Sequence, residues 1–202
     1  PRLVIGVDIA IEALKTTRQR GYVPLLADAH DLPLIDGCAD VVIANAALHH
    51  CDDMARVLAE AARLVRPGGL LITDQDPQIT AWKFRGLGFW LHHAKYSPLF
   101  PLFRQIVGRP LATWNQQMAR FHTEVHNQFP GDGVDLSLYH QVLEPMGYEF
   151  QLFPHNHTLG AEVLQGAWGK APRLIRLAQW LSGMNPDAVA SAQSVMCIAQ
   201  RR

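Results

Sequence analysis

Acidic residues are absent from a long stretch in the middle of this chain. No Asp or Glu occurs from Pro77 to Thr123, where there are six Lys and Arg residues, whereas residues 26–76 carry nine acids and three arginines. Over the whole chain 18 bases balance 18 acids, so the net charge does not indicate a nucleic-acid-binding protein. The change of sign near Pro77 indicates an internal boundary.

Cysteine is scarce and long apolar runs are missing. The three cysteines, Cys38, Cys51 and Cys197, are scattered and form no Cys-x-x-Cys pair, which indicates a reducing, cytoplasmic setting. No stretch is apolar over the length that a membrane-spanning helix needs. The remaining composition, 49% hydrophobic in 202 residues, suits one sizeable domain with its own core.

Short apolar runs that end near a polar residue recur through the first part of the chain. Four such runs predict strands, at LVIGVD (3–8), YVPLLAD (22–28), DVVIANAAL (40–48) and LLITDQD (70–76). Two segments between them have helical spacing, IEALKTTRQRG (11–21) and DDMARVLAEAARLVRPGG (52–69). This alternation predicts an α/β protein with a parallel sheet and helices on its faces. Pro24 has no backbone donor, so the second strand is predicted at an edge.

The rest of the chain contains an insertion and a return to the core. Residues 78–135 break the alternation and predict a helical lid, since nine of the 17 aromatic residues lie between Trp82 and Phe121. A helix, a glycine turn and a strand are predicted over 136–153, an amphipathic helix near 172–181, and a last strand at SVMCIAQ (194–200). We therefore assign 1–77 and 136–202 to the core and 78–135 to the lid.

Polar residues gather where a ligand of such a sheet would bind. In open α/β sheets, ligands lie beyond the carboxyl ends of the strands. The residues that follow the predicted strand ends are Asp8, Asp28, Asn45 and Asp74.

Three motifs in this order resemble the class I S-adenosylmethionine-dependent methyltransferases, in the small-molecule branch related to ubiquinone and menaquinone methyltransferases. The motifs are GVDIA, ADAHDLPLIDGCADVVIANAALHH and LVRPGGLLITD, and the similarity covers residues 3–77, 136–153 and 194–200. The resemblance implies a Rossmann-like, mostly parallel sheet with an antiparallel last strand. It also implies S-adenosylmethionine as cofactor and methyl transfer to a small, amphipathic or hydrophobic acceptor.

By the same resemblance, Asp8 would hold the two ribose hydroxyls of the cofactor. A carboxylate has two acceptor oxygens and therefore suits a pair of neighbouring hydroxyl groups. Ile9 would pack on the adenine face. The alternative for Asp8 is an N-cap of the helix that begins near Ile11.

The resemblance also places Asp28, Ala29, Asn45 and Ala46 around the cofactor. Asp28 would accept from the adenine amino group and the backbone N–H of Ala29 would meet a ring nitrogen, whereas Asn45 and Ala46 would lie beside the methionine part. The alternative for Asp28 is that it caps a turn.

His49, His50, Trp82 and Trp90 are the candidates for contact with the substrate. The resemblance places both imidazoles between cofactor and substrate, where His50 could orient the acceptor or accept a proton. The alternative is that a histidine packs under the helix that begins near Asp52. The basic, aromatic segment 82–121 suits either contact with an anionic membrane surface or simple packing on the domain.

One part of the family pattern has no counterpart in these residues. The family has a strand before LVIGVD and then a glycine-rich loop of the form ExGxGxG, and neither is found in the sequence. We therefore expect an N-terminally truncated, inactive fragment, with a gap or a closed gap between the strands at 3–8 and 40–45.

Two other functions and a metal site were weighed against this interpretation. A nicotinamide-dependent oxidoreductase can also end a strand at an acid that binds ribose, and a non-catalytic Rossmann-like binding domain would not need the glycine-rich loop. An antiparallel last strand would favour the methyltransferase. His122 and His126 share a helix face, but no third ligand accompanies them, so no metal is expected.

Overall fold

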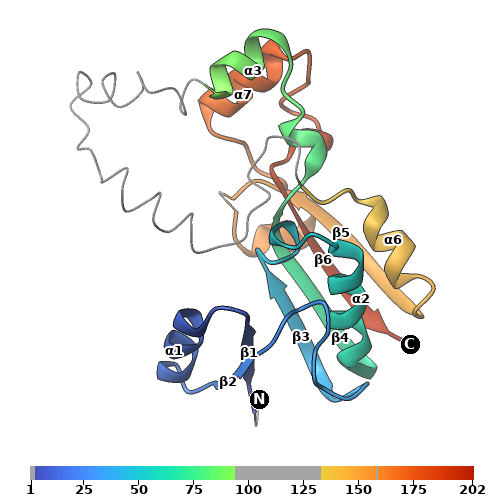
Figure 1. The fold of residues 1–202 in the computed structure, drawn as a ribbon. Helices are drawn as coiled ribbons and strands as arrows, with labels where there is room; N and C mark the ends of the chain where they lie inside the picture. The colour runs from blue at the N-terminus through green and yellow to red at the C-terminus, as the bar shows by residue number, and fades with distance from the viewer. Residues whose placement is uncertain (1–2, 94–132, 158) are drawn as a thin grey trace.

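The computed structural model describes residues 3–93, 133–157 and 159–202 (Figure 1). The strands are β1 (Ile5–Asp8), β2 (Val23–Leu26), β3 (Ala39–Asn45), β4 (Val65–Pro77), β5 (Tyr148–His155) and β6 (Ser194–Arg201). The α-helices are α1 (Ile11–Gln19), α2 (Met54–Leu64), α3 (Gly86–His93), α6 (Ser137–Leu143) and α7 (Arg173–Leu181). Short 3-10 turns are η1 (Leu48–His50), η2 (Ile79–Trp82), η4 (Ala161–Gln165) and η5 (Val189–Ser191). The predicted α/β alternation is confirmed.

The larger sheet has four strands in the order β3-β4-β6-β5. β3 runs parallel to β4, whereas β6 is antiparallel to both β4 and β5. The last strand is therefore reversed and lies beside the strand predicted at 70–76. This confirms the arrangement that distinguishes the methyltransferase interpretation from the dehydrogenase interpretation.

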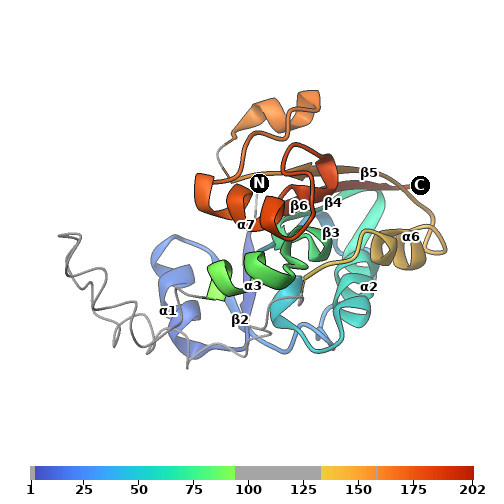
Figure 2. The same cartoon turned by 90° about the horizontal axis from the view of Figure 1, so that it is seen from above.

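The first two strands form a separate parallel pair. β1 and β3 share no ladder, so the sheet is split between them, as Figures 1 and 2 show. β2 pairs with β1 alone among the described strands, and its Pro24 lies opposite Gly6. The edge position predicted from Pro24 is confirmed, because a residue without an N–H weakens an edge strand least.

One hydrophobic core lies between the larger sheet and the helices α2 and α6. It contains Leu58 and Ala62 of α2, Tyr139 and Leu143 of α6, and Leu71 of β4, all without exposed surface. α2 begins at a capping residue, since Asp53 accepts from the backbone N–H of Arg56. The core therefore anchors β3 and β4, whose carboxyl ends carry the predicted site.

The helix predicted over 52–69 is shorter than expected. α2 ends at Leu64, and Val65 to Gly69 already belong to β4, where Val65 pairs with Ala39. A Cβ at Gly69 would lie 2.7 Å from the carbonyl oxygen of Asp40. The glycine therefore permits close packing of β4 against the start of β3, which a helix exit would not require.

Only the first part of the predicted lid lies within the described residues. α3 packs against α7, and both views show this pair beyond the carboxyl ends of β3 and β4 (Figures 1 and 2). Gly88 permits the contact, since a Cβ there would lie 2.1 Å from the carbonyl oxygen of Ala178. Across the described ranges, no helix combines the length and apolar character needed to span a bilayer.

The cysteines offer a direct check of this packing. Cys197 is fully buried on β6, and burial raises the pKa of its thiol to about 12, whereas Cys38 is exposed. Because the thiolate is the reactive form, we expect iodoacetamide at pH 8 to label Cys38 readily and Cys197 only after unfolding. Mass spectrometry of native and urea-unfolded protein measures this. Rapid labelling of Cys197 in the native protein would contradict the described β4–β6–β5 packing.

Candidate cofactor and substrate site

Asp8 lies at the end of β1, where one of its two carboxylate oxygens accepts a hydrogen bond. Oδ1 accepts a hydrogen bond from the backbone N–H of Ala10 at 2.7 Å, and Oδ2 has no partner among the described residues. The side chain of the next residue, Ile9, is 66% exposed. This bond closes a turn before α1 and is not the N-cap considered for Asp8, because α1 begins at Ile11 and the carbonyl of Ala10 accepts its first backbone hydrogen bond. One oxygen of Asp8 together with an exposed apolar neighbour remains for a ligand.

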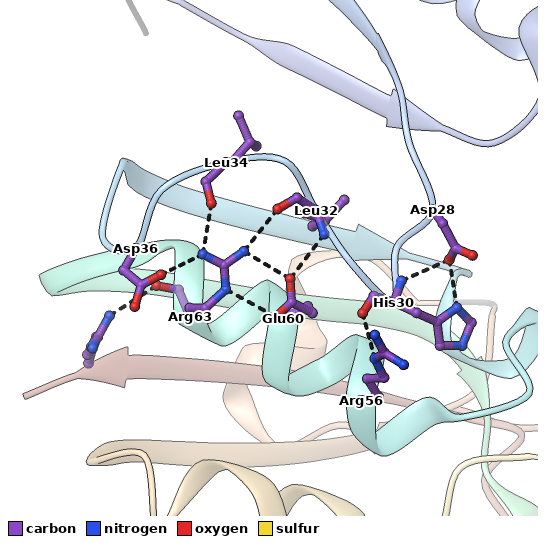
Figure 3. Close-up of polar contacts among 9 residues, drawn as sticks. Asp28, His30, Leu32, Leu34, Asp36, Arg56, Glu60 and Arg63 are labelled. Carbon is purple, nitrogen blue, oxygen red and sulfur yellow. Dashed lines mark hydrogen bonds and ion pairs between the residues drawn. The ribbon is translucent and has the colours of Figure 1, made fainter.

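Asp28 has a similar arrangement after β2 (Figure 3). Its Oδ1 accepts from the backbone N–H of His30 at 2.9 Å and pairs with the imidazole Nδ1 at 2.6 Å. The backbone N–H and then the ring of His30 hold the pKa of the Asp28 carboxyl below its ordinary value. Asp28 thus caps a turn, as one interpretation predicted, and stays ionised with Oδ2 without a described partner. Ala29 packs partly against the core.

The loop after Asp28 is held against α2 by Arg63 (Figure 3). The guanidinium donates to the backbone carbonyls of Leu34 (2.8 Å) and Leu32 (3.1 Å), and it pairs with Asp36 (2.6 Å) and Glu60 (2.9 Å). These carboxylates raise the pKa of Arg63. One planar, charged side chain therefore joins a loop that has no strand partner to a buried helix.

We expect Arg63→Lys to lower the Tm by on the order of 5 °C. A lysine cannot reproduce the fork that binds two carbonyls and two carboxylates. Arg66→Lys is the matched control, because Arg66 makes an exposed ion pair with Asp40, which contributes little. Calorimetry of the two variants measures the difference, and equal Tm values would remove the anchoring role from Arg63.

Asn45 ends β3 exposed, opposite Asp74 of β4. The following Ala46 has a left-handed backbone with a φ of +50°, unusual for a residue other than glycine. Its N–H donates to the carbonyl oxygen of Asp74 at 2.7 Å. The tight turn at Ala46 therefore brings the chain from β3 into η1, which carries His49 and His50.

A β-bulge at Gln75 then changes which side chains of β4 face the core. Leu71 and Thr73 are buried before it, the ladder to β6 shifts between Thr73 and Asp76, and Gln75 has a φ of +63°. Beyond the bulge the buried residue is Asp76, with no exposed surface. Strained residues of this kind persist where the surrounding structure holds them, often at functional sites.

Asp76 binds His49 twice. Its Oδ1 accepts from the backbone N–H of His49 at 3.2 Å and pairs with the ring Nδ1 at 2.8 Å. The other oxygen, Oδ2, is buried and has no partner in the described structure. The sequence analysis placed Asp76 inside a strand run and missed this pair, because no local signal predicts a bulge at a glutamine.

A second histidine–carboxylate pair lies on the other side of β4. His155 Nε2 pairs with Asp74 Oδ1 at 2.8 Å, and His157 bonds to Gln75 and to Ser194. Burial and then the neighbouring His155 lower the pKa of His157. The sequence analysis assigned no role in this site to either histidine.

The two tryptophans predicted to contact substrate differ in exposure and in hydrogen bonding. Trp82 is half-buried and donates from Nε1 to the carbonyl oxygen of Gln193 at 3.1 Å, so its indole is used in packing. Trp90 lies on α3 and is 72% exposed. His50 lies in η1 next to His49, with ring centroids 3.9 Å apart.

The remaining candidates for binding lie elsewhere. A surface hollow of about 420 Å³ is lined by Tyr148 and Arg202, at the amino end of β5 and therefore opposite the predicted site. No three metal-binding side chains gather in the part of the chain that the structure describes. His122 and His126 lie outside that part.

Comparison with protein families finds one match to this region. Residues 2–73 match the family described as methyltransferase domain. The malonyl-[acyl-carrier protein] O-methyltransferase of Hamiltonella defensa is 37% identical over 71 residues, 34% of this chain and 28% of that protein. The ubiquinone/menaquinone biosynthesis C-methyltransferase of Acidiphilium cryptum is 39% identical over 71 residues, 31% of this chain and 28% of that protein. The chain thus spans less than a third of the length of these two relatives.

Solved structures agree on the fold. An S-adenosylmethionine-dependent methyltransferase from Mesorhizobium loti superposes with a TM-score of 0.54 at 16% identity, over 98% of this chain and 80% of that one. A methyltransferase from Thermotoga maritima gives a TM-score of 0.51 at 18% identity, over 100% of this chain and 74% of that one. At these identities the likeness is one of fold, and it confirms the Rossmann-like prediction.

Proposed function

We propose that this chain, whose residues 2–73 belong to the class I S-adenosylmethionine-dependent methyltransferases, takes part in methyl transfer to a small, amphipathic or hydrophobic acceptor. The observation that carries the proposal is the family match over β1 to β4, whose carboxyl ends bear Asp8, Asp28 and Asn45. The nicotinamide alternative gains no support from the relatives named above, which are methyltransferases.

The residues at this edge fit the cofactor. The carboxylates of Asp8 and Asp28 each keep one oxygen without a described partner, which suits acceptors for ribose hydroxyls and for an adenine amino group. Exposed Ile9 offers an apolar contact to a flat base, and Ala29 a backbone N–H. Asn45 and Ala46 bound the place where the methionine part would lie. The bound cofactor supplies a methyl group on a cationic sulfur.

The protein's part in such a reaction is positioning and the exclusion of water. His49 and His50 of η1, which follows the carboxyl end of β3, are the proposed contacts to the acceptor, together with Trp82 and Trp90 of the lid. His50 would orient the acceptor. The domain division at residues 77 and 136 is part of this proposal, with the core binding the cofactor and the lid selecting the acceptor.

Isothermal titration calorimetry tests the cofactor directly, on a protein in which the family's strand and glycine-rich loop are added before Pro1. We expect S-adenosylmethionine and S-adenosylhomocysteine to bind and NAD not to bind. Binding of NAD alone would favour the oxidoreductase, and binding of none of the three would favour the non-catalytic domain.

We further propose a cytoplasmic protein that touches an anionic membrane surface through α3 and α7. Large apolar side chains on these adjacent helices are exposed: Leu87, Leu174, Leu177 and Trp180. Three exposed bases flank them, Lys83, Arg85 and Arg173. The helix predicted near 172–181 is present as α7, and its Leu174 and Leu177 are exposed although their spacing is typical of a packed face.

We expect the protein to bind vesicles that contain phosphatidylserine and to lose that binding in the triple variant Lys83→Glu, Arg85→Glu, Arg173→Glu. Each base near an anionic surface contributes about 1 kcal/mol, so reversing three should weaken binding at least 100-fold, and salt should weaken it too. The control reverses Lys15, Arg18 and Arg20 around α1. Vesicle sedimentation measures both, and equal loss in the two triple variants would exclude this surface.

A further inference from the structure

The pair formed by His49 and Asp76 has a geometry that none of the other histidine contacts at this edge shares. His30, His155 and His157 each have both ring nitrogens in hydrogen bonds. His49 uses Nδ1 for Asp76, and no described residue bonds to its Nε2.

This arrangement selects one form of the neutral imidazole. A carboxylate accepts hydrogen bonds and cannot donate, so the ring proton of His49 lies on Nδ1. Nε2 therefore carries a lone pair. Asp76 also accepts from the backbone N–H of His49. The two bonds together fix the orientation of the ring and the position of the turn that carries it.

The burial of Asp76 determines how much the fold depends on its contact with His49. A carboxylate with no exposed surface and one oxygen unpartnered is costly for the fold unless a positive charge comes near it. The imidazole of His49 is the group that lies against this carboxylate, at 2.8 Å. The side chain of His49 is 16% exposed, so its ring connects the buried carboxylate with solvent.

We propose that His49 is the catalytic residue that takes a proton from the methyl acceptor through Nε2, and that Asp76 is its positioning residue. The inference rests on the proposed function. An O–H or acidic C–H bond of the acceptor breaks, its proton passes to Nε2, and its electron pair forms the bond to the methyl carbon. The carbon–sulfur bond of the cofactor breaks with its electrons on sulfur, so the charges balance. The acceptor class is therefore one that must lose a proton, a phenol, an enol or a 1,3-dicarbonyl compound.

The first test needs no acceptor. Long-range ¹H–¹⁵N NMR at pH 8 should show His49 protonated at Nδ1 and unprotonated at Nε2. Asp76→Asn keeps an oxygen for both hydrogen bonds but places an NH2 group where the buried Oδ2 has no partner, so a thermal unfolding curve accompanies the spectrum. This tautomer should persist in the folded variant. His140, which pairs with Glu144 away from the site, is the internal control. A proton on Nε2 of His49 in the unchanged protein would overturn the proposal.

The second test uses the protein with the family's strand and glycine-rich loop added before Pro1. It measures transfer from radiolabelled S-adenosylmethionine to a phenol, a 1,3-diketone, a fatty acid and a primary amine. We expect transfer to the phenol or the diketone, and a loss of about 100-fold or more in kcat for both His49→Gln and Asp76→Asn. Cofactor affinity should not change, and the double variant should lose no more than either single one.

The outcomes separate the two proposals. Failure to bind S-adenosylmethionine would overturn the proposed function. Binding without transfer to the phenol or the diketone would overturn the acceptor class and with it the role of His49. Transfer that His49→Gln leaves unchanged would overturn it as well.

Discussion

Replacing Asp8 with alanine is expected to weaken S-adenosylmethionine binding by about 1–3 kcal/mol, or roughly 5- to 150-fold. The carboxylate ends β1 and keeps Oδ2 free of described partners while Oδ1 bonds to the N–H of Ala10. If the two ribose hydroxyls donate hydrogen bonds to this carboxylate, the alanine variant leaves both hydroxyls buried without a charged acceptor. Calorimetry on the protein with the family's strand and glycine-rich loop added before Pro1 gives the change in affinity.

The turn bond of Asp8 has to be separated from ligand binding. Asn can accept the same bond from the N–H of Ala10, but it is uncharged and has only one acceptor oxygen. Asp8→Asn should therefore lose affinity with little change in Tm. Asp53→Asn is the control, since Asp53 also accepts a backbone N–H bond, that of Arg56, and lies outside the proposed ribose site. Unchanged affinity in Asp8→Asn would leave Asp8 with the turn bond alone.

The strand ends could be predicted because buried parallel strands have a plain local signal. Each is a short apolar run that stops where the chain turns toward solvent, and this found Asp8, Asn45 and Asp74 without any knowledge of contacts. The edge position of β2 followed from Pro24 for an equally local reason.

The histidine–carboxylate pairs could not be predicted in the same way. Asp76 faces the core only because the bulge at Gln75 shifts the alternation of β4, and a glutamine at a φ of +63° carries no signal in the sequence. His155 meets Asp74 across 81 residues, a contact that depends on the reversed last strand between β4 and β5. The anchoring of the loop by Arg63 is also tertiary, since its partners Leu32, Leu34 and Asp36 lie 27 to 31 residues away in the chain.

The split between β1 and β3 leaves the unit formed by β1, α1 and β2 with little buried surface. Of the described side chains in residues 3–26, Leu14 alone is buried. The apolar side chains of β1, β2 and β3 that a continuous sheet would cover are exposed: Ile5 39%, Val7 37%, Val23 48%, Val41 47% and Ile43 66%. A pair of four-residue strands with a nine-residue helix is marginal in water without further packing.

We therefore expect the unit formed by β1, α1 and β2 to open locally while the larger sheet stays folded. In residues 1–202 expressed alone, amides of β1 and β2 should exchange on the order of 100-fold faster than those of β4 and β6. Hydrogen–deuterium exchange with mass spectrometry resolves these segments, since the larger sheet has its own buried core.

Leu14→Ala sharpens the prediction, because it removes the one buried anchor of this unit. A buried Leu→Ala change costs about 2–5 kcal/mol, more than a marginal unit can lose, so β1 and β2 should lose their remaining protection. Ile11→Ala is the control on the same helix, where the side chain is 59% exposed. The protection of β4 and β6 should be the same in both variants, because their core lies against α2 and α6 on the other side of the split. A single cooperative transition, with amides of β1 protected as well as those of β4, would show that the two sheets fold as one unit despite the missing ladder between β1 and β3.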